Sequence, residues 1–143
     1  MDIDIIIPIY NAFDFVKKCI ETVIEHTDLT QHTLLLVNDK STDERILPLL
    51  NSFIKENQSL NIILIDNKDN QGFVRTVNIG MQYSHHDVVL LNSDTEVTRN
   101  WLSKIQNCAY SKPAVATVTP LSNNATLASV PVFLAENTIP PGL

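Results

Sequence analysis

The amino-acid sequence predicts an α/β domain in which a mainly parallel β-sheet carries helices on both faces. Short apolar runs rich in β-branched residues alternate with amphipathic stretches along the 143 residues of the chain. This alternation is typical of parallel strands that are connected by helices. Hydrophobic residues make up 44% of the chain and charged residues 18%, a composition that indicates a folded core and excludes a disordered chain.

Five strands are predicted from the apolar runs. Runs that are apolar at nearly every position indicate strands buried on both faces, as in a parallel sheet. The predicted strands cover residues 3–9, 33–37, 62–65, 88–91 and 114–119, and residues 130–134 are a candidate for a further short strand.

Four helices are predicted from apolar side chains that recur every three or four residues. Asn11 is expected to cap the first helix, and Gly72 precedes the third. The second helical stretch follows Thr42 but is expected to become regular only near Leu47, because Pro48 is unfavourable inside a helix. The helices are expected around residues 16–24, 46–54, 73–81 and 101–109.

Charge and apolar-run length exclude several classes of protein. The net charge is -6 without a cluster of Lys and Arg, so no nucleic-acid partner is expected. No apolar run approaches the ~20 residues of a membrane-spanning helix, and the first residues lack the basic start of a signal peptide. The chain is therefore expected to be soluble and cytoplasmic. Cys19 and Cys108 are expected to be buried thiols rather than a disulfide.

The sequence changes character after residue 120. Residues 121–126 are polar, and residues 121–143 contain three prolines without a clear helix or strand pattern. The predicted organisation is therefore an α/β unit over residues 1–120, followed by an irregular segment over residues 121–143.

Polar residues follow four of the predicted strands, where an open parallel sheet binds its ligands. Asp94 follows the fourth strand and is the candidate ligand for a metal ion, with Glu96 as a second ligand. Mg²⁺ or Mn²⁺ often binds through one or two protein carboxylates, while substrate phosphates and waters complete the shell. The alternative is that Asp94 or Ser93 only caps the following helix.

Three further residues have two interpretations each. Asp39 is a candidate acceptor for a hydrogen bond from a base or sugar, or it forms a local Asx turn. Tyr10 stacks on a base, or it closes the edge of the core. Arg75 binds phosphate oxygens, or it is simply solvated.

Taken together, these segments resemble the signature motifs of family 2 glycosyltransferases, which have the Rossmann-like GT-A fold. The resemblance extends over about residues 3–120. It rests on residues 5–11 (IIIPIYN), 37–43 (VNDKSTD), 70–73 with 78–80 (NQGF and NIG) and 90–96 (LLNSDTE). Residues 119–126 (TPLSNNAT) also resemble bacterial members that build surface polysaccharides, including rhamnosyltransferase-like ones.

The resemblance implies a role for each motif. Asp39 would recognise the base, usually uracil, Ser93 would lie beside the sugar or ribose, and Asp94 would bind the metal as part of a DxD-type motif. The metal ion would bridge the diphosphate and stabilise the leaving nucleoside diphosphate. The candidate nucleotide-binding residues are Pro8, Tyr10, Asn11, Asp39, Gly72, Arg75 and Ser93, and the candidate metal ligands are Asp94 and Glu96.

The implied activity is metal-dependent transfer of a sugar, with inversion, from a nucleotide-diphosphate sugar to an acceptor hydroxyl. In this family a carboxylate in the second half of the protein is the general base, and no segment of this chain matches that half. The chain is therefore expected to be a truncated, donor-binding part. Asn38 and Asn92 stand where the family commonly has Asp, so a dTDP-linked sugar is a candidate donor besides a UDP-linked one.

The resemblance also implies partners. The acceptor would be a saccharide or a lipid-linked molecule, and the full-length protein would lie peripherally at the inner face of the membrane. Apolar surface that the second half normally covers is expected to drive self-association.

Three other functions are weighed against this one. A non-catalytic nucleotide-sugar-binding or assembly module is favoured by the missing base. A receiver-type signalling domain fits the length, but it requires an acidic pair after the first strand, where residues 8–11 read PIYN. A nucleotidyltransferase requires a Gly-rich first loop with Arg or Lys, which the sequence lacks.

Overall fold

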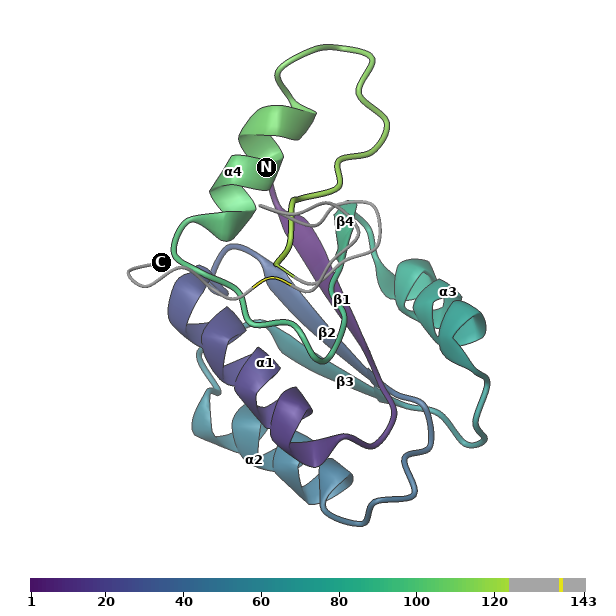
Figure 1. Ribbon diagram of the computed structural model, residues 1–143. Coiled ribbons are helices and arrows are strands. Elements are labelled where there is room, and N and C mark those ends of the chain that lie inside the picture. Colours follow the sequence, from purple (N-terminus) through teal and green to yellow (C-terminus); the bar gives the residue numbers. More distant parts are fainter. Residues whose placement is uncertain (124–136, 138–143) are drawn as a thin grey trace. The chain divides into compact units, whose positions relative to one another are not determined.

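The computed structural model describes residues 1–123 and residue 137. The chain forms two compact units, residues 1–97 and residues 98–143, and each unit is described by itself (Figure 1). The first unit contains the sheet, three helices and every candidate site residue.

The sheet of the first unit has four parallel strands in the order β3-β2-β1-β4. The central strands β1 and β2 are buried almost throughout, whereas the edge strands β3 and β4 are partly exposed. Four predicted strands are confirmed, each to within one residue at either end. Their bounds are Ile3–Ile9 for β1, Thr33–Asn38 for β2, Ile62–Asp66 for β3 and Asp87–Leu90 for β4.

Three helices connect these strands: α1 Phe13–His26, α2 Ile46–Glu56 and α3 Phe73–Tyr83. Because crossover connections between parallel strands are right-handed, α1 and α2 lie on one face of the sheet. The connection through α3 runs in the opposite direction, back across the sheet to β4, so α3 lies on the other face (Figure 1). The predicted α/β fold, with a parallel sheet and helices on both faces, is confirmed.

Helix α2 contains Pro48 as its third residue. A proline is tolerated there because the N–H groups of the first helical turn have no partner within the helix. The helix begins at Ile46, one residue before the predicted start of its regular part. Among the helices of the described ranges, none is long and apolar enough to cross a lipid bilayer.

Helix α3 packs closely on the central strands through Gly80. A core cluster of Ile6, Leu35 and Val37 lies on this face of the sheet, and Ile79 of α3 packs against it. A Cβ atom added to Gly80 would lie 2.7 Å from Cγ2 of Ile6 and 3.3 Å from Cγ2 of Val37. The absence of a side chain at residue 80 therefore sets the distance between α3 and the sheet.

Replacing Gly80 with alanine is expected to destabilise the protein by about 1–3 kcal/mol, the usual cost of overpacking a core. The Ile6 side chain cannot turn away cheaply, because β-branched side chains have few allowed rotamers. Urea unfolding measures the change, and the exposed Gln82→Ala on the same helix is the matched control. An unaltered unfolding midpoint in Gly80→Ala would contradict the close packing.

Pro8 lies inside β1, beyond the part of this strand that pairs with β4. Strand β4 ends at Leu90, which is opposite Ile6, and the N–H of Leu91 donates to the carbonyl of Ile6 at 3.0 Å. Pro8 is two residues further along, beyond the end of β4, so no residue of β4 pairs with it. On the other side of β1 the ladder continues, and the N–H of Asp39 donates to the carbonyl of Ile9 at 2.8 Å.

The second unit contains helix α4, Trp101–Ala109, as predicted. The predicted strand over residues 114–119 is wrong, because these residues form a turn and an irregular segment and are mostly exposed. Apolar, β-branched residues favour a strand only where neighbouring strands supply hydrogen bonds and burial. The candidate strand over residues 130–134 lies outside the described residues. The predicted division into a nucleotide-sugar-binding region over residues 1–120 and an irregular segment over residues 121–143 stays a prediction.

The two cysteines differ in their surroundings. Cys19 in α1 is fully buried, as predicted, whereas the prediction for Cys108 is wrong because that side chain is exposed. Both thiols are free.

Candidate functional site

The strand order places a topological switch point between β1 and β4. The chain leaves β1 toward β2 on one side, and β4 lies on the other side, so the direction of the strand order reverses there. Such a point is where open α/β sheets form a ligand-binding crevice. Tyr10 and Asn11 follow β1, and Ser93, Asp94 and Glu96 follow β4.

Asp39 lies one residue beyond β2 and is only 4% exposed. Its Oδ1 accepts a hydrogen bond from the N–H of Gln71 at 2.7 Å and another from the amide of Asn67 at 2.9 Å. Its Oδ2 accepts from the N–H of Gly72 at 2.8 Å. The same Asn67 amide donates to the hydroxyl of Thr76 at 3.4 Å. The carboxylate therefore ties the end of β2 to the loop that begins α3.

These contacts also set the charge of Asp39. Burial raises the pKa of this carboxyl, but the hydrogen bonds outweigh it, that from the Gln71 N–H most strongly, and hold the pKa below its ordinary value. A carboxylate offers about four acceptor sites, and the side chain of Thr76 adds a fourth hydrogen bond to these three, so donors within the protein occupy its usual acceptor capacity. The alternative of an Asx turn at Asp39 is wrong, because the local turn is made by Asn38, whose Oδ1 accepts from the N–H of Ser41 at 3.2 Å.

Asn11 joins two loops rather than capping a helix. Its Oδ1 accepts from the N–H groups of Thr42 and Asp43, both at 2.8 Å, and its own N–H donates to the hydroxyl of Ser41 at 2.9 Å. The predicted cap is wrong, because Ala12 is the N-cap residue of α1 and no side chain caps it. Asn11 has a φ of 58°, a left-handed conformation that Asn tolerates better than most residues. It thus connects the ends of β1 and β2.

Residues 92–97 form a loop whose acidic side chains are exposed. The N–H of Thr95 donates to the carbonyl of Asn92 at 3.1 Å, which closes a turn with Ser93 and Asp94 at its tip. Ser93 is half-buried, and Asp94 and Glu96 are exposed. The alternative of a helix cap is wrong, because α4 begins at Trp101 and its N-cap residue is Asn100.

The remaining candidate residues have varied environments. Pro8 is buried within β1. Tyr10 is 49% exposed, so about half of its surface is accessible to a ligand, and both interpretations of it stay predictions. Arg75 is exposed on α3. Gly72 precedes α3 with a φ of 76°, a conformation that favours glycine.

The acidic loop has the chemistry of a metal site that is completed by its substrate. In the part of the chain that the structure describes, no group of three or more His, Cys, Asp or Glu side chains could hold a metal ion. Two exposed carboxylates, Asp94 and Glu96, still fit Mg²⁺ or Mn²⁺, which commonly take one or two protein carboxylates together with phosphates and waters.

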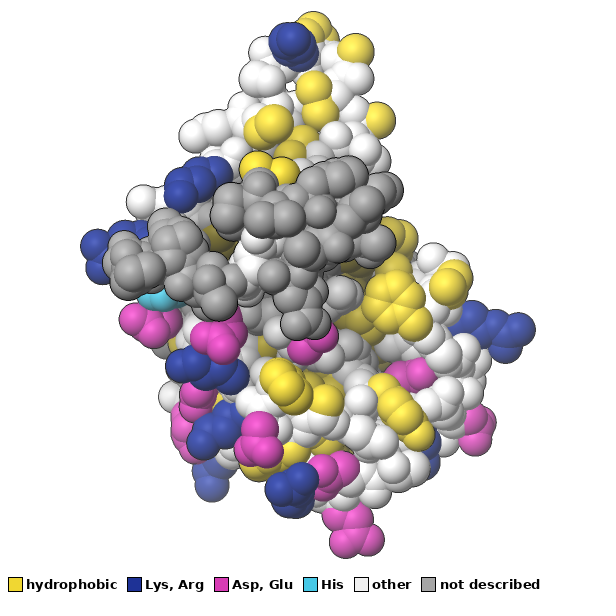
Figure 2. Space-filling model, in the orientation of Figure 1, with side chains coloured by type: hydrophobic (Ala, Val, Ile, Leu, Met, Phe, Trp, Pro, Cys, Tyr) yellow, Lys and Arg dark blue, Asp and Glu magenta, His cyan; other side chains and the backbone are white. Residues whose placement is uncertain are grey.

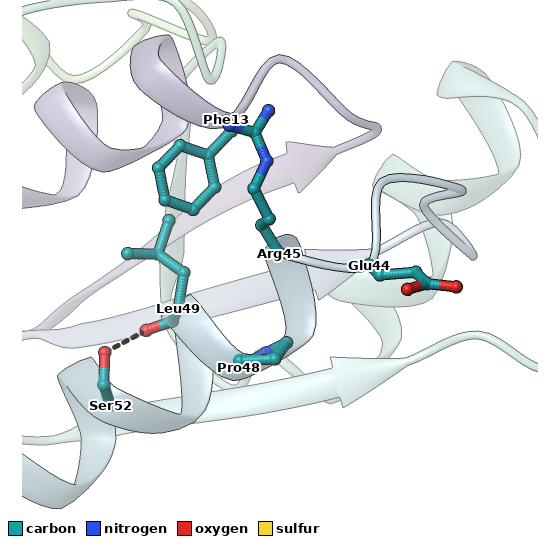
Figure 3. Close-up of a pocket in the computed structure, with 6 residues that line it drawn as sticks. All are labelled: Phe13, Glu44, Arg45, Pro48, Leu49 and Ser52. Atoms are coloured by element: carbon teal, nitrogen blue, oxygen red, sulfur yellow. Dashed lines mark hydrogen bonds between the residues drawn. The ribbon is translucent and has the colours of Figure 1, made fainter.

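A separate, open pocket lies between the first turns of α1 and α2 (Figure 3). The guanidinium of Arg45 lies 4.5 Å from the ring centre of Phe13, and it also binds the carboxylate of Asp43 at 2.7 Å. Its charge is therefore already paired. The lining residues are Phe13, Glu44, Arg45, Pro48, Leu49 and Ser52, none of which is a candidate site residue.

Sequence reasoning missed several residues that build the site. Asn67 and Thr76 are buried and belong to the Asp39 network. Thr22 and Cys19 of α1 bond to the acidic loop. Thr22 carries a detectable signal, because it is a polar residue within the apolar face of a predicted helix, whereas nothing local distinguishes Asn67 from a turn residue.

Comparison with known proteins agrees with this architecture. The solved mannosyltransferase PcManGT from Pyrobaculum calidifontis, in complex with GDP-Man and Mn²⁺, has a TM-score of 0.72 at 17% identity over 78% of this chain and 32% of that chain. A crystal structure of S. aureus TarS in complex with UDP-GlcNAc has a TM-score of 0.65 at 17% identity, covering 89% of this chain and 41% of that chain. These likenesses support the GT-A fold.

Sequence comparisons give the family. Polypeptide N-acetylgalactosaminyltransferase 11 of Xenopus tropicalis is 31% identical over 104 residues, 71% of this chain and 17% of that protein. This chain covers 11% to 31% of the length of the curated relatives it matches. The family model described as Glycosyl transferase family 2 matches residues 4–131. Since that match includes all four strands and the acidic loop, the chain belongs to glycosyl transferase family 2.

Proposed function

We propose that this chain is the donor-binding part of a glycosyltransferase that transfers a sugar, with inversion, from a nucleotide-diphosphate sugar. The observation that supports this most is the position of the acidic loop. Residues 92–97 follow β4 at the switch point, with their carboxylates exposed, where an α/β sheet binds a ligand. The complexes of PcManGT with GDP-Man and Mn²⁺ and of TarS with UDP-GlcNAc are consistent with such a donor.

In this proposal Asp94 and Glu96 hold the metal ion, Mg²⁺ or Mn²⁺, through carboxylate oxygens. The ion, when bound, neutralises the charge that develops on the leaving nucleoside diphosphate. Ser93, at the tip of the turn, contacts the sugar or ribose.

The nucleoside lies on the other side of the crevice. Tyr10 offers an exposed ring for stacking, and Asp39 accepts an N–H of the base at a carboxylate oxygen that it shares with its loop donors. Arg75 binds phosphate oxygens on the α3 side. Asn11 supports this arrangement by joining the loops that follow β1 and β2.

The finer parts of the proposal concern partners. The sugar donor is UDP- or dTDP-linked, and the acceptor is a saccharide or a lipid-linked molecule. The full-length protein would lie at the inner face of the membrane. No residue of this chain is assigned as the general base that deprotonates the acceptor, so a binding module without turnover is the alternative.

Calorimetric titration of the chain with UDP, dTDP and GDP, each with Mn²⁺ and with EDTA, tests the proposal. We expect one nucleotide to bind at least about tenfold more tightly with Mn²⁺, since the phosphates supply ligands that the protein lacks. Absence of binding by all three nucleotides would contradict the proposal. Incubation with the matching sugar nucleotide then separates a transferase from a binding module by release of the nucleoside diphosphate.

Self-association is expected through apolar side chains on α3. Phe73 and Val74, in the first turn of α3, are 60% and 69% exposed, and Figure 2 shows several hydrophobic side chains exposed on one face of the molecule. Sedimentation velocity at rising concentration is expected to show a dimer or larger species, because exposed apolar patches favour association. Val74→Glu is expected to shift the chain toward the monomer. A single monomeric species at every concentration would refute the expectation.

A further inference from the structure

Helix α1 directs two polar side chains, Cys19 and Thr22, from its buried face toward the acidic loop. The other buried residues of this helix are aliphatic. The thiol of Cys19 donates to the carbonyl of Asn92 at 3.5 Å, and the hydroxyl of Thr22 accepts from the N–H of Val97 at 3.2 Å. Residues three apart on a helix lie on the same face. One turn of α1 therefore binds both ends of residues 92–97.

The Thr22 hydroxyl is oriented for this contact. Its proton is donated to the carbonyl of Cys19 at 2.9 Å, which leaves its lone pairs to accept the N–H of Val97. Thr22 is 8% exposed, so water does not readily replace the bond. A methyl group in place of the hydroxyl would leave a buried N–H without a partner.

The anchored loop combines a fixed backbone with accessible carboxylates. The side chains of Leu91 and Val97, on either side of the loop, are each 7% exposed, whereas Asp94 and Glu96 are exposed. The pKa of the Cys19 thiol is raised to about 12, mainly by burial and also by the charges of Asp94 and Glu96, whereas a hydrogen bond with the Thr95 backbone lowers it. Because their charges act on Cys19, the two carboxylates lie near α1.

Metal binding depends on such fixation. Mg²⁺ requires nearly ideal octahedral geometry, and ligands must be held within about 0.5 Å of their productive positions. An exposed loop that ordered only on binding would lose conformational entropy at every residue it fixed, which would weaken the apparent metal affinity. Contacts that order the loop beforehand therefore strengthen binding without touching the ligand.

We propose that Thr22, supported by Cys19, is a positioning residue for the metal-binding loop, which it holds in the conformation that presents Asp94 to a metal–diphosphate ligand. This inference rests on the proposed function of that loop.

Calorimetry of Thr22→Val with the nucleotide that binds best tests the inference. The variant keeps the shape of the side chain but removes the hydroxyl, so we expect nucleotide affinity with Mn²⁺ to fall at least about tenfold, as for groups that orient metal ligands. Affinity with EDTA should stay unchanged, and Thr22→Ser should restore the Mn²⁺-dependent part. Ser52→Ala is the matched control, because Ser52 makes the same hydroxyl-to-carbonyl bond, to Leu49 at 2.7 Å, on α2.

The outcomes separate the two proposals. Absence of Mn²⁺-dependent nucleotide binding by the unaltered chain overturns the proposed function and this inference with it. Full metal-dependent affinity in Thr22→Val overturns the inference alone. Should that variant fail to fold, Cys19→Ala takes its place, because it removes the bond from the thiol to the carbonyl of Asn92. Its nucleotide affinity should fall with Mn²⁺ and stay unchanged with EDTA, and full metal-dependent affinity overturns the inference.

Discussion

Replacing Asp94 with alanine is expected to abolish the metal-dependent part of nucleotide binding while leaving the fold intact. Affinity with Mn²⁺ should fall to the affinity measured with EDTA, a loss of about tenfold or more, because even groups that only orient metal ligands contribute about 10- to 100-fold. Asp94 is exposed at the tip of a turn, so the free energy of unfolding should change by no more than about 0.5 kcal/mol. Calorimetry with Mn²⁺ and with EDTA, followed by urea unfolding, measures both quantities.

A matched control for this variant is Glu25→Ala. Glu25 is an exposed carboxylate near the end of α1, and this helix runs back from the carboxyl ends of the strands to their amino ends. The substitution therefore removes the same charge at a position away from the crevice. Its affinity should equal that of the unaltered chain. Equal affinity in Asp94→Ala as well would show that the loop binds no metal.

Replacing Asp39 with alanine is expected to lower the free energy of unfolding by about 3 kcal/mol or more. Hydrogen bonds to a charged group each contribute about 1.5–3 kcal/mol, and their loss leaves buried donors unpaired. Here the donors are the N–H groups of Gln71 and Gly72 and the amide of Asn67. Urea unfolding measures the loss, and Asp69→Ala, an exposed carboxylate of the same loop, should change stability little.

The Asp39 effect should also depend on pH. Its folded pKa is lowered, because loop hydrogen bonds outweigh the opposing effect of burial. The stability it confers is therefore present above the ordinary value of 3.8 and is lost as the pH falls through the folded value. The unfolding free energies of the unaltered chain and Asp39→Ala should thus converge in acid. A gap that stays constant down to the lowest pH at which both fold would count against an ionised role for Asp39.

The fold could be predicted to the extent that it depends on local pattern. Apolar runs located β1 to β4 because burial on both faces requires nearly continuous apolar residues. Residues 114–119 carry the same composition but form no strand, since a strand also needs a neighbour that the local sequence does not encode. The helix periodicity likewise failed to distinguish buried Cys19 from exposed Cys108.

The site could be predicted only as far as the edge of the sheet on which it lies. Residues at the carboxyl ends of parallel strands share one edge, so Asp39 and Asp94 could be selected without coordinates. The partners of Asp39 lie 28 to 33 residues away, and Asn11 bonds to residues 31 and 32 positions further on. Such pairings arise from tertiary structure, and in both cases they replaced the local turn or cap that the sequence favoured.

The lack of an N–H at Pro8 has a consequence for the shape of the crevice. After the N–H of Leu91 has donated to Ile6, the next rung of a parallel ladder would need an N–H from residue 8 of β1. Proline cannot provide it, so pairing stops and the chain must turn away from the sheet at Asn92. A single missing hydrogen atom in one strand thus fixes the length of its neighbour, and with it the point at which the carboxylates of residues 94 and 96 leave the sheet.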